Sequence, residues 1–146
     1  MKSKQPEPRD VVSCGTVTWR YNKDTHVPEI LLVRPFERRP NFGIPKGHLE
    51  LDEDPAECAR RETKEEAGIT VNIGDVVGTC KTVYGNERKT VIAYWARPEP
   101  VNQEPVSLDG ENVEVGYYPI NNLPPIHVYQ RDLILLVADV LRELAI

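Results

Sequence analysis

Residues Gly47 to Ile69 read GHLELDEDPAECARRETKEEAGI, and this stretch contains the boundaries of a helix. Asp54 can accept hydrogen bonds from the free N–H groups of a first turn, and Pro55 suits the first helical position. Glu57 can reach back to the cap, as in a capping box. Gly68 can end the helix, because glycine adopts the left-handed conformation without strain. The stretch therefore predicts a loop, a helix and a second loop.

The predicted helix has two different faces. At about 100° per residue, a stripe of small side chains that can lie close to a sheet consists of Ala56, Ala59, Thr63 and Ala67. The adjacent stripe carries three carboxylates, those of Glu62, Glu65 and Glu66. Their mutual repulsion and their place at the negative end of the helix dipole each cost on the order of 0.3–1 kcal/mol. A solvated charged face is one interpretation, but a bound divalent cation removes the repulsion and is the favoured one.

The same residues resemble the Nudix box of the nucleoside-diphosphate-linked-X hydrolases, G-x5-E-x7-R-E-U-x-E-E-x-G-U, where U is a bulky aliphatic residue. Every fixed position matches, from Gly47 through Glu53 to Gly68. Thr63 occupies the first U position and is the one departure, which concerns packing more than chemistry. The resemblance implies an α/β (α+β) Nudix fold, in which a mixed, twisted sheet lies between helices.

The resemblance also implies roles for individual residues. The implied ligands of Mg²⁺ or Mn²⁺ are the Gly47 carbonyl and the carboxylates of Glu62, Glu65 and Glu66. Glu65 is in addition a candidate catalytic residue. Outside the box, Glu111 is a candidate ligand or general base, with an ordinary loop carboxylate as the equal alternative. Arg61 can pair with Glu57 and Glu65, and by resemblance it orients a glutamate and performs no chemical step.

Residues around the box point to a substrate class. Gly43 to His48 read GIPKGH, similar to the PKG-H sequence of asymmetric diadenosine tetraphosphate hydrolases and their diphosphoinositol relatives. The candidates for binding phosphates are Arg34, Lys46, Lys81, Arg88 and Lys89. Tyr84 and Tyr129 are expected to stack on a base, with packing against the core as the alternative. His48 and His127 are interpreted as non-catalytic.

The rest of the chain is predicted to be rich in strands and to end in a helix. Alternating or continuous apolar runs predict strands at residues 11–19, 30–33, 73–84, 89–96 and 113–119. Gly85 and Asn86 form the expected turn of a hairpin. Prolines predict an irregular loop over 97–110, and apolar residues at helical spacing from Leu133 to Leu144 predict a C-terminal amphipathic helix.

Length and composition bound the class of protein. A chain of 146 residues is expected to hold one domain, here 11–146 after a flexible segment 1–10. The sequence shows neither a signal peptide nor a membrane-spanning stretch, so a cytoplasmic protein is expected. The net charge of −5, with local basic clusters, disfavours a long nucleic acid and suits a small polyphosphate. Cys14, Cys58 and Cys80 are expected to be reduced and mostly buried, without a zinc site.

The leading functional hypothesis is a metal-dependent pyrophosphohydrolase of dinucleoside polyphosphates, acting as a monomer or homodimer on a small molecule. An alternative of the same class cleaves diphosphoinositol polyphosphates or modified nucleoside triphosphates, because the box determines the bond and not the substrate. A third hypothesis is a regulatory module that binds a nucleotide without turnover. The intact box argues against this last hypothesis.

Overall fold

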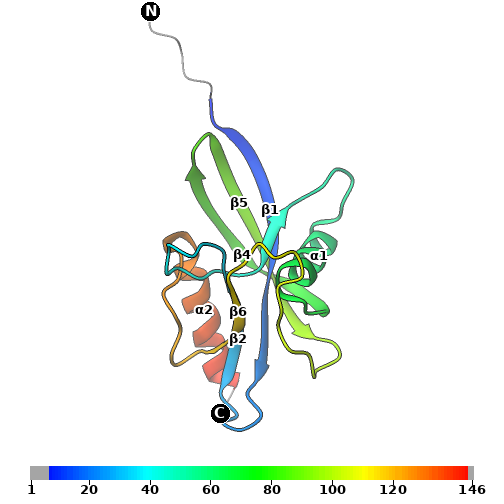
Figure 1. The fold of residues 1–146 in the computed structure, drawn as a ribbon, viewed down its shortest axis with the longest axis vertical. Helices are drawn as coiled ribbons and strands as arrows, with labels where there is room; N and C mark the ends of the chain where they lie inside the picture. The colour runs from blue at the N-terminus through cyan, green and yellow to red at the C-terminus, as the bar shows by residue number, and fades with distance from the viewer. Residues whose placement is uncertain (1–6, 145–146) are drawn as a thin grey trace, which may run out of the picture.

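The computed structural model describes residues 7–144 and consists of a mixed sheet between two helices (Figure 1). In chain order the elements are β1 (Arg9–Tyr21), β2 (Pro28–Arg34), β3 (Lys46–His48), α1 (Pro55–Ala67), β4 (Val71–Tyr84), β5 (Glu87–Pro98), β6 (Glu114–Pro119) and α2 (Val128–Leu144). The strands lie in the order β4-β5-β1-β2-β6, and β3 pairs with β1. β1 and β5 are parallel while the other pairs are antiparallel, which confirms the predicted fold class.

Each helix covers one face of the sheet, and β1 contributes side chains to both faces because they alternate along a strand. Val17 and Trp19 belong to the core under α2. Cys14 faces the other way and forms a small core with Cys58 and Ala59 of α1. At one end of the molecule, β1, β4 and β5 extend past both helices (Figure 1).

The predicted strands and both helices are confirmed, and the differences have local causes. The structure adds β3, which three residues within a run of Gly and Pro could not signal by periodicity. α2 begins at Val128, so Tyr129 lies in its first turn, ahead of the apolar residues that recur from Leu133 and mark the helix in the sequence. β1 begins at Arg9, where Arg9 pairs with Glu87 at 2.8 Å, inside the segment predicted to be flexible. The rest of that prediction falls mainly on residues 1–6, outside the described residues.

α1 is bounded as the sequence predicts. The Asp54 carboxylate accepts a hydrogen bond from the N–H of Ala56 at 2.8 Å, and Gly68 ends the helix with a φ of 71°. The expected capping box is wrong in one respect, because the Glu57 carboxylate instead lies 3.5 Å from Arg60. The buried stripe also differs by one residue from the prediction: it consists of Cys58, Ala59, Thr63 and Ala67, while Ala56 is half-buried.

Thr63, the departure from the box pattern, joins a buried chain of hydroxyl groups. Its hydroxyl donates to the carbonyl of Ala59 at 2.8 Å, so it must accept from the hydroxyl of Thr16, also at 2.8 Å. Thr16 in turn accepts from Thr18 at 2.7 Å. This chain connects α1 to β1, so Thr63 replaces aliphatic packing with a directional contact.

We expect Thr63→Val to lower the free energy of unfolding by about 1–3 kcal/mol, because it removes one acceptor from the buried chain of hydroxyl groups and leaves one of its O–H donors without a partner. Urea unfolding followed by circular dichroism measures the change. Thr79→Val is the matched control, since Thr79 is exposed on β4. A Thr63→Val protein as stable as the wild type would contradict a stabilising role of the hydroxyl chain.

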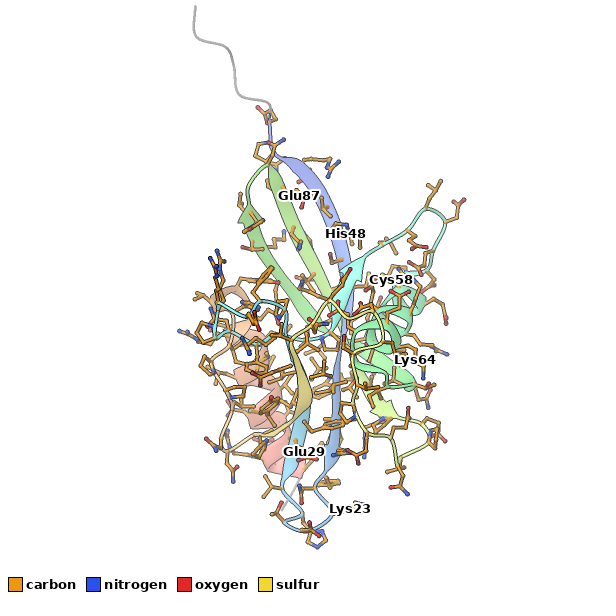
Figure 2. The ribbon with its side chains drawn as sticks, viewed as in Figure 1. Lys23, Glu29, His48, Cys58, Lys64 and Glu87 are labelled. Atoms are coloured by element: carbon orange, nitrogen blue, oxygen red, sulfur yellow. The ribbon has the colours of Figure 1, made fainter. Side chains whose placement is uncertain are left out.

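The three cysteines are free and buried, as predicted. Burial raises the pKa of each thiol, so they are protonated at neutral pH. Cys58 lies on the side of α1 that faces the strands, and its thiol is 3.6 Å from the carbonyl of His48 (Figure 2).

Neither helix in residues 7–144 combines the length and the hydropathy needed to cross a membrane.

Candidate active site

The three box glutamates of α1 have different surroundings. Glu62 lies 2.7 Å from Arg61 and is mostly buried, whereas Glu65 lies 3.2 Å from Arg61 and is half exposed. Glu66 accepts a hydrogen bond from the side-chain amide of Asn112 at 3.1 Å. Its other oxygen lies 3.4 Å from the backbone N–H of Lys46 in β3. The box helix therefore presents Glu66 to the sheet and Glu65 to solvent.

Arg61 connects α1 to the loop that precedes it. Its guanidinium bonds the Glu53 carboxylate at 2.8 Å and the carbonyl of His48 at 3.2 Å. The bond from Arg61 lowers the pKa of Glu53 to about 2. The predicted pairing with Glu65 is present, but Glu57 lies with Arg60 instead. Arg61 thus holds the box loop and helix together, in agreement with a structural role.

Burial makes two of the glutamates costly to ionise. It raises the pKa of Glu66 to about 7, against the hydrogen bond from Asn112 and the charge of Lys46. It also raises the pKa of Glu62, opposed by Arg61 and reinforced by the charges of Glu65 and Asp109. A cation close to these carboxylates would reverse both shifts.

Gly47 is packed so closely against α1 that no side chain fits. A methyl group at this position would overlap the carboxylate carbon and both oxygens of Glu62. The Gly47 carbonyl lies 3.5 Å from the thiol of Cys58, so it also faces α1. A backbone carbonyl and a carboxylate side by side are the hard oxygen donors that Mg²⁺ and Mn²⁺ prefer, so the residues fit such an ion.

The oxygen donors suit Mg²⁺ or Mn²⁺ chemically, but they are not already arranged as a metal centre. Nowhere in residues 7–144 do three or more His, Cys, Asp or Glu side chains come together as a metal centre. Arg61 accounts for part of this arrangement, since it neutralises Glu62 and Glu65. An ion would compete with Arg61 for both carboxylates.

Next to Glu66 lies a small cavity of about 110 Å³. Its walls come from the β2 end, the GIPK run, the loop before β6 and α2; they are Val33, Pro35, Gly43, Ile44, Lys46, Glu66, Glu111, Asn112, His127 and Gln130. The structure therefore brings Glu111 to the same cavity as Glu66, although the two are far apart in the sequence.

A larger cavity of about 510 Å³ adjoins the small one. It is lined by Pro35, Phe36, Arg39, Lys46, Thr82, Tyr84, Lys89, His127, Val128 and Tyr129. Pro35, Lys46 and His127 line both cavities. Aromatic rings and cations dominate the larger one, and no carboxylate occurs among the described residues that line it. The predicted residues Lys46, Tyr84, Lys89 and Tyr129 thus meet at one place.

Gln130 fixes two walls of these cavities. Its side-chain oxygen accepts from the N–H of Ile44 at 2.9 Å, and its amide donates to the hydroxyl of Tyr129 at 2.9 Å. Gln130 is completely buried, and a methyl group on Gly43 would approach its amide to 2.8 Å. The run before Lys46 and the ring of Tyr129 are therefore held in a fixed relation.

Three predicted phosphate-binding residues lie elsewhere. Arg34 donates to the Glu114 carboxylate at 3.0 Å and to the carbonyl of Phe36 at 2.8 Å, so it secures the loop after β2. Arg88 pairs with Asp10 at 2.9 Å. Lys81 and Arg88 line another cavity of about 500 Å³, whose walls also include Lys89. Because side chains alternate along a strand, Lys81 and Arg88 point to the opposite face from Tyr84 and Lys89.

Several residues of the two cavities were not predicted as site residues. Phe36, Arg39 and His127 line the larger cavity, and Asn112 and Gln130 line the smaller one. Arg39 belongs to a basic cluster visible in the sequence, and Asn112 follows the candidate Glu111. Gln130 has no signal of its own, since its partners become neighbours only in the fold.

Comparison with known proteins places the chain in a family. A family model described as "NUDIX domain" matches residues 15–137. The chain is 39% identical over 85 residues to "Nudix hydrolase 21, chloroplastic" of Arabidopsis thaliana, which covers 58% of this chain and 41% of that protein. It is 35% identical over 83 residues to a "Nucleoside triphosphate pyrophosphatase/Nudix hydrolase fusion protein" of Bifidobacterium longum (strain NCC 2705), covering 57% and 17%. The match thus spans about two fifths or less of these relatives.

Solved structures share the fold over nearly the whole chain. A C. elegans Ap4A hydrolase in a binary complex matches with a TM-score of 0.76 at 24% identity, covering 91% of this chain and 98% of that one. A MutT NUDIX hydrolase from Burkholderia pseudomallei matches with a TM-score of 0.71 at 22% identity, covering 88% and 98%. At these identities the likeness is one of fold.

Proposed function

The chain belongs to the Nudix domain family, and on this premise we propose that it is a metal-dependent pyrophosphohydrolase of dinucleoside polyphosphates. One observation carries the proposal: a cavity with carboxylates and a cavity with aromatic rings and cations adjoin at Lys46 and His127. The first suits a cation and a scissile phosphoanhydride. The second suits a base with the remaining phosphates.

Within this proposal the box residues hold the cofactor. Mg²⁺ or Mn²⁺ bound by the Gly47 carbonyl and by Glu62, Glu65 and Glu66 would supply charge neutralisation and water activation for attack on phosphorus. Lys46 contributes a point charge to the phosphates where the cavities meet. As water attacks phosphorus and the bridging P–O bond breaks, a carboxylate accepts the proton of the water. Glu111 lines the small cavity and Glu65 is half exposed on the box helix, so these two are the candidates for that step.

The aromatic lining favours a nucleotide among the possible substrates. Tyr84, Tyr129 and Phe36 offer ring faces on which a base can stack. Diphosphoinositol polyphosphates have no base and remain the alternative, together with modified nucleoside triphosphates. A screen of these three substrate groups with Mg²⁺, with products separated by chromatography, tests the proposal. A folded protein that cleaves none of them would favour a nucleotide-binding module without turnover.

The two lysines of the β4–β5 hairpin, Lys81 and Lys89, allow a matched test of where the substrate phosphates bind. We expect Lys89→Ala to raise KM for a dinucleoside tetraphosphate by about tenfold, because Lys89 lines the larger cavity. Lys81 does not line the larger cavity and lies on the opposite face of the hairpin, so Lys81→Ala removes the same charge and is expected to leave KM nearly unchanged. Initial rates over a range of substrate concentrations measure both values.

Equal effects of Lys81→Ala and Lys89→Ala would contradict this placement, because they would indicate a general electrostatic attraction.

Tyr84→Ala distinguishes nucleotide substrates from substrates without a base. Loss of base stacking should weaken binding of a nucleotide by about 1–3 kcal/mol but should leave a diphosphoinositol polyphosphate unaffected.

A further inference from the structure

Within residues 7–144, Asn112 is the one residue whose side chain hydrogen-bonds to Glu66. Its amide nitrogen donates to the Glu66 carboxylate at 3.1 Å, across 46 positions of sequence. Asn112 is half-buried and lines the small cavity together with Glu111. The second oxygen of Glu66 faces the backbone N–H of Lys46 at 3.4 Å. Glu66 is therefore held from two sides by neutral donors.

The segment that carries Asn112 is anchored to the end of α1. The N–H of Val106 donates to the carbonyl of Ala67 at 2.8 Å, and the N–H of Leu108 and Asp109 donate to the carbonyl of Glu65 at 3.2 and 3.1 Å. These bonds satisfy carbonyls that have no partner inside the helix. The loop and the box helix thus form one connected unit.

A local turn then directs the chain toward the cavity. The Asp109 carboxylate accepts from the hydroxyl of Ser107 at 3.2 Å and from the N–H of Glu111 at 3.0 Å. Directly after Asn112, the N–H of Val113 donates to the carbonyl of Arg34 at 2.9 Å. Asn112 is fixed on both sides, so its amide reaches Glu66 from a determined position.

We infer that Asn112 is a positioning residue that holds the Glu66 carboxylate in the orientation in which it binds the cation. This inference rests on the proposed function. An amide donor favours the ionised form of a carboxylate, which is the form that binds a cation, and it brings no positive charge of its own. Arg61 acts differently on Glu62 and Glu65, because it brings a positive charge that an ion must displace.

Binding of Mn²⁺ alone to the full chain, followed by electron paramagnetic resonance of the free ion, tests the inference without turnover. We expect Asn112→Ala to weaken Mn²⁺ binding by about 10–100-fold, the usual effect of removing a residue that orients a ligand. Asn102→Ala, in the same long connection between β5 and β6, is the matched control and should bind Mn²⁺ as the wild type does. Thermal unfolding with a chelator should show little change for either variant.

Asn112→Leu is the second variant, because it keeps most of the side-chain volume and offers no donor. Weakened Mn²⁺ binding in both Asn112 variants, with the wild-type melting temperature in chelator, supports the inference. Wild-type Mn²⁺ affinity in Asn112→Leu, while Glu66→Gln binds more weakly, overturns the role of Asn112 and leaves the proposed function intact. A wild-type protein that binds no Mn²⁺ overturns both.

Discussion

Glu66→Gln is expected to lower kcat by roughly 10²–10⁴-fold while the protein stays folded. The substitution keeps the size of the side chain and its contact with Asn112, but it removes a negative charge from the proposed cation site. Stabilisation of developing charge is the main contribution expected from such a site, so the loss falls on turnover. Single-turnover and steady-state rates with Mg²⁺ measure it. Glu65→Gln is expected to act in the same direction.

The stability of the metal-free protein is the control for this variant. The pKa of Glu66 determines whether the substitution raises or lowers the free energy of unfolding. Burial raises that pKa from an ordinary value of 4.5 to about 7, so the folded state binds the proton more tightly than the unfolded chain. The stabilisation is complete below pH 4.5 and is lost as the pH rises through about 7. The loss is on the order of 3 kcal/mol. Glutamine does not titrate and avoids it.

In a chelator at pH 8, Glu66→Gln should therefore be at least as stable as the wild type. Added Mg²⁺ should raise the melting temperature of the wild type more than that of the variant, because a ligand stabilises the state that binds it. Undiminished turnover of the folded variant with Mg²⁺ would show that Glu66 is not a ligand.

The box helix could be predicted almost residue by residue because its signals are local. Asp54, Pro55 and Gly68 lie at the helix ends and act on neighbouring backbone groups. The buried stripe contains Cys58 where the sequence predicts Ala56. The cause is a tertiary contact, since Cys58 packs against Cys14 of β1. Local sequence determines where this helix begins and ends, and its contact with the sheet determines which side is buried.

The sequence contains a signal for the two faces of the β4–β5 hairpin. A two-residue turn at Gly85 and Asn86 sets Thr82 opposite Lys89 and Lys81 opposite Thr90. Alternation then puts Lys89 with Tyr84 and Lys81 on the other face. Lys81 and Lys89 are therefore close in the sequence but lie on opposite faces of the hairpin.

Other parts of the site could not be predicted from the sequence. The contacts from Asn112 to Glu66 and from Gln130 to Ile44 cross 46 and 86 positions. No periodicity or motif relates residues so far apart, and only the packed fold brings them together. The ion pair of Arg34 is of the same kind, because its partner Glu114 lies on the neighbouring strand β6, 80 positions later in the sequence.

Gly47→Ala is expected to lower turnover by about 100-fold or more, although it adds only one methyl group. That methyl would overlap the Glu62 carboxylate, which is the mobile end of its side chain and can move away. The fold should therefore persist while Glu62 leaves the position in which it would bind the cation. A displacement of about 1 Å at a reacting centre can cost 10²-fold in rate. Turnover and Mn²⁺ affinity, measured beside the circular dichroism spectrum, check the result.

Two comparisons separate this cause from a general defect. Gly78→Ala is the control, because its methyl would lie 3.6 Å from Leu133, an ordinary contact, and turnover should be retained. If displacement of Glu62 is the cause, Glu62→Ala should have little further effect in the Gly47→Ala background, since the carboxylate is already out of place. Full additivity of the two substitutions would mean that Gly47 acts independently of Glu62. Glycine at position 47 would then be required by the backbone of β3 and not by the position of the Glu62 carboxylate.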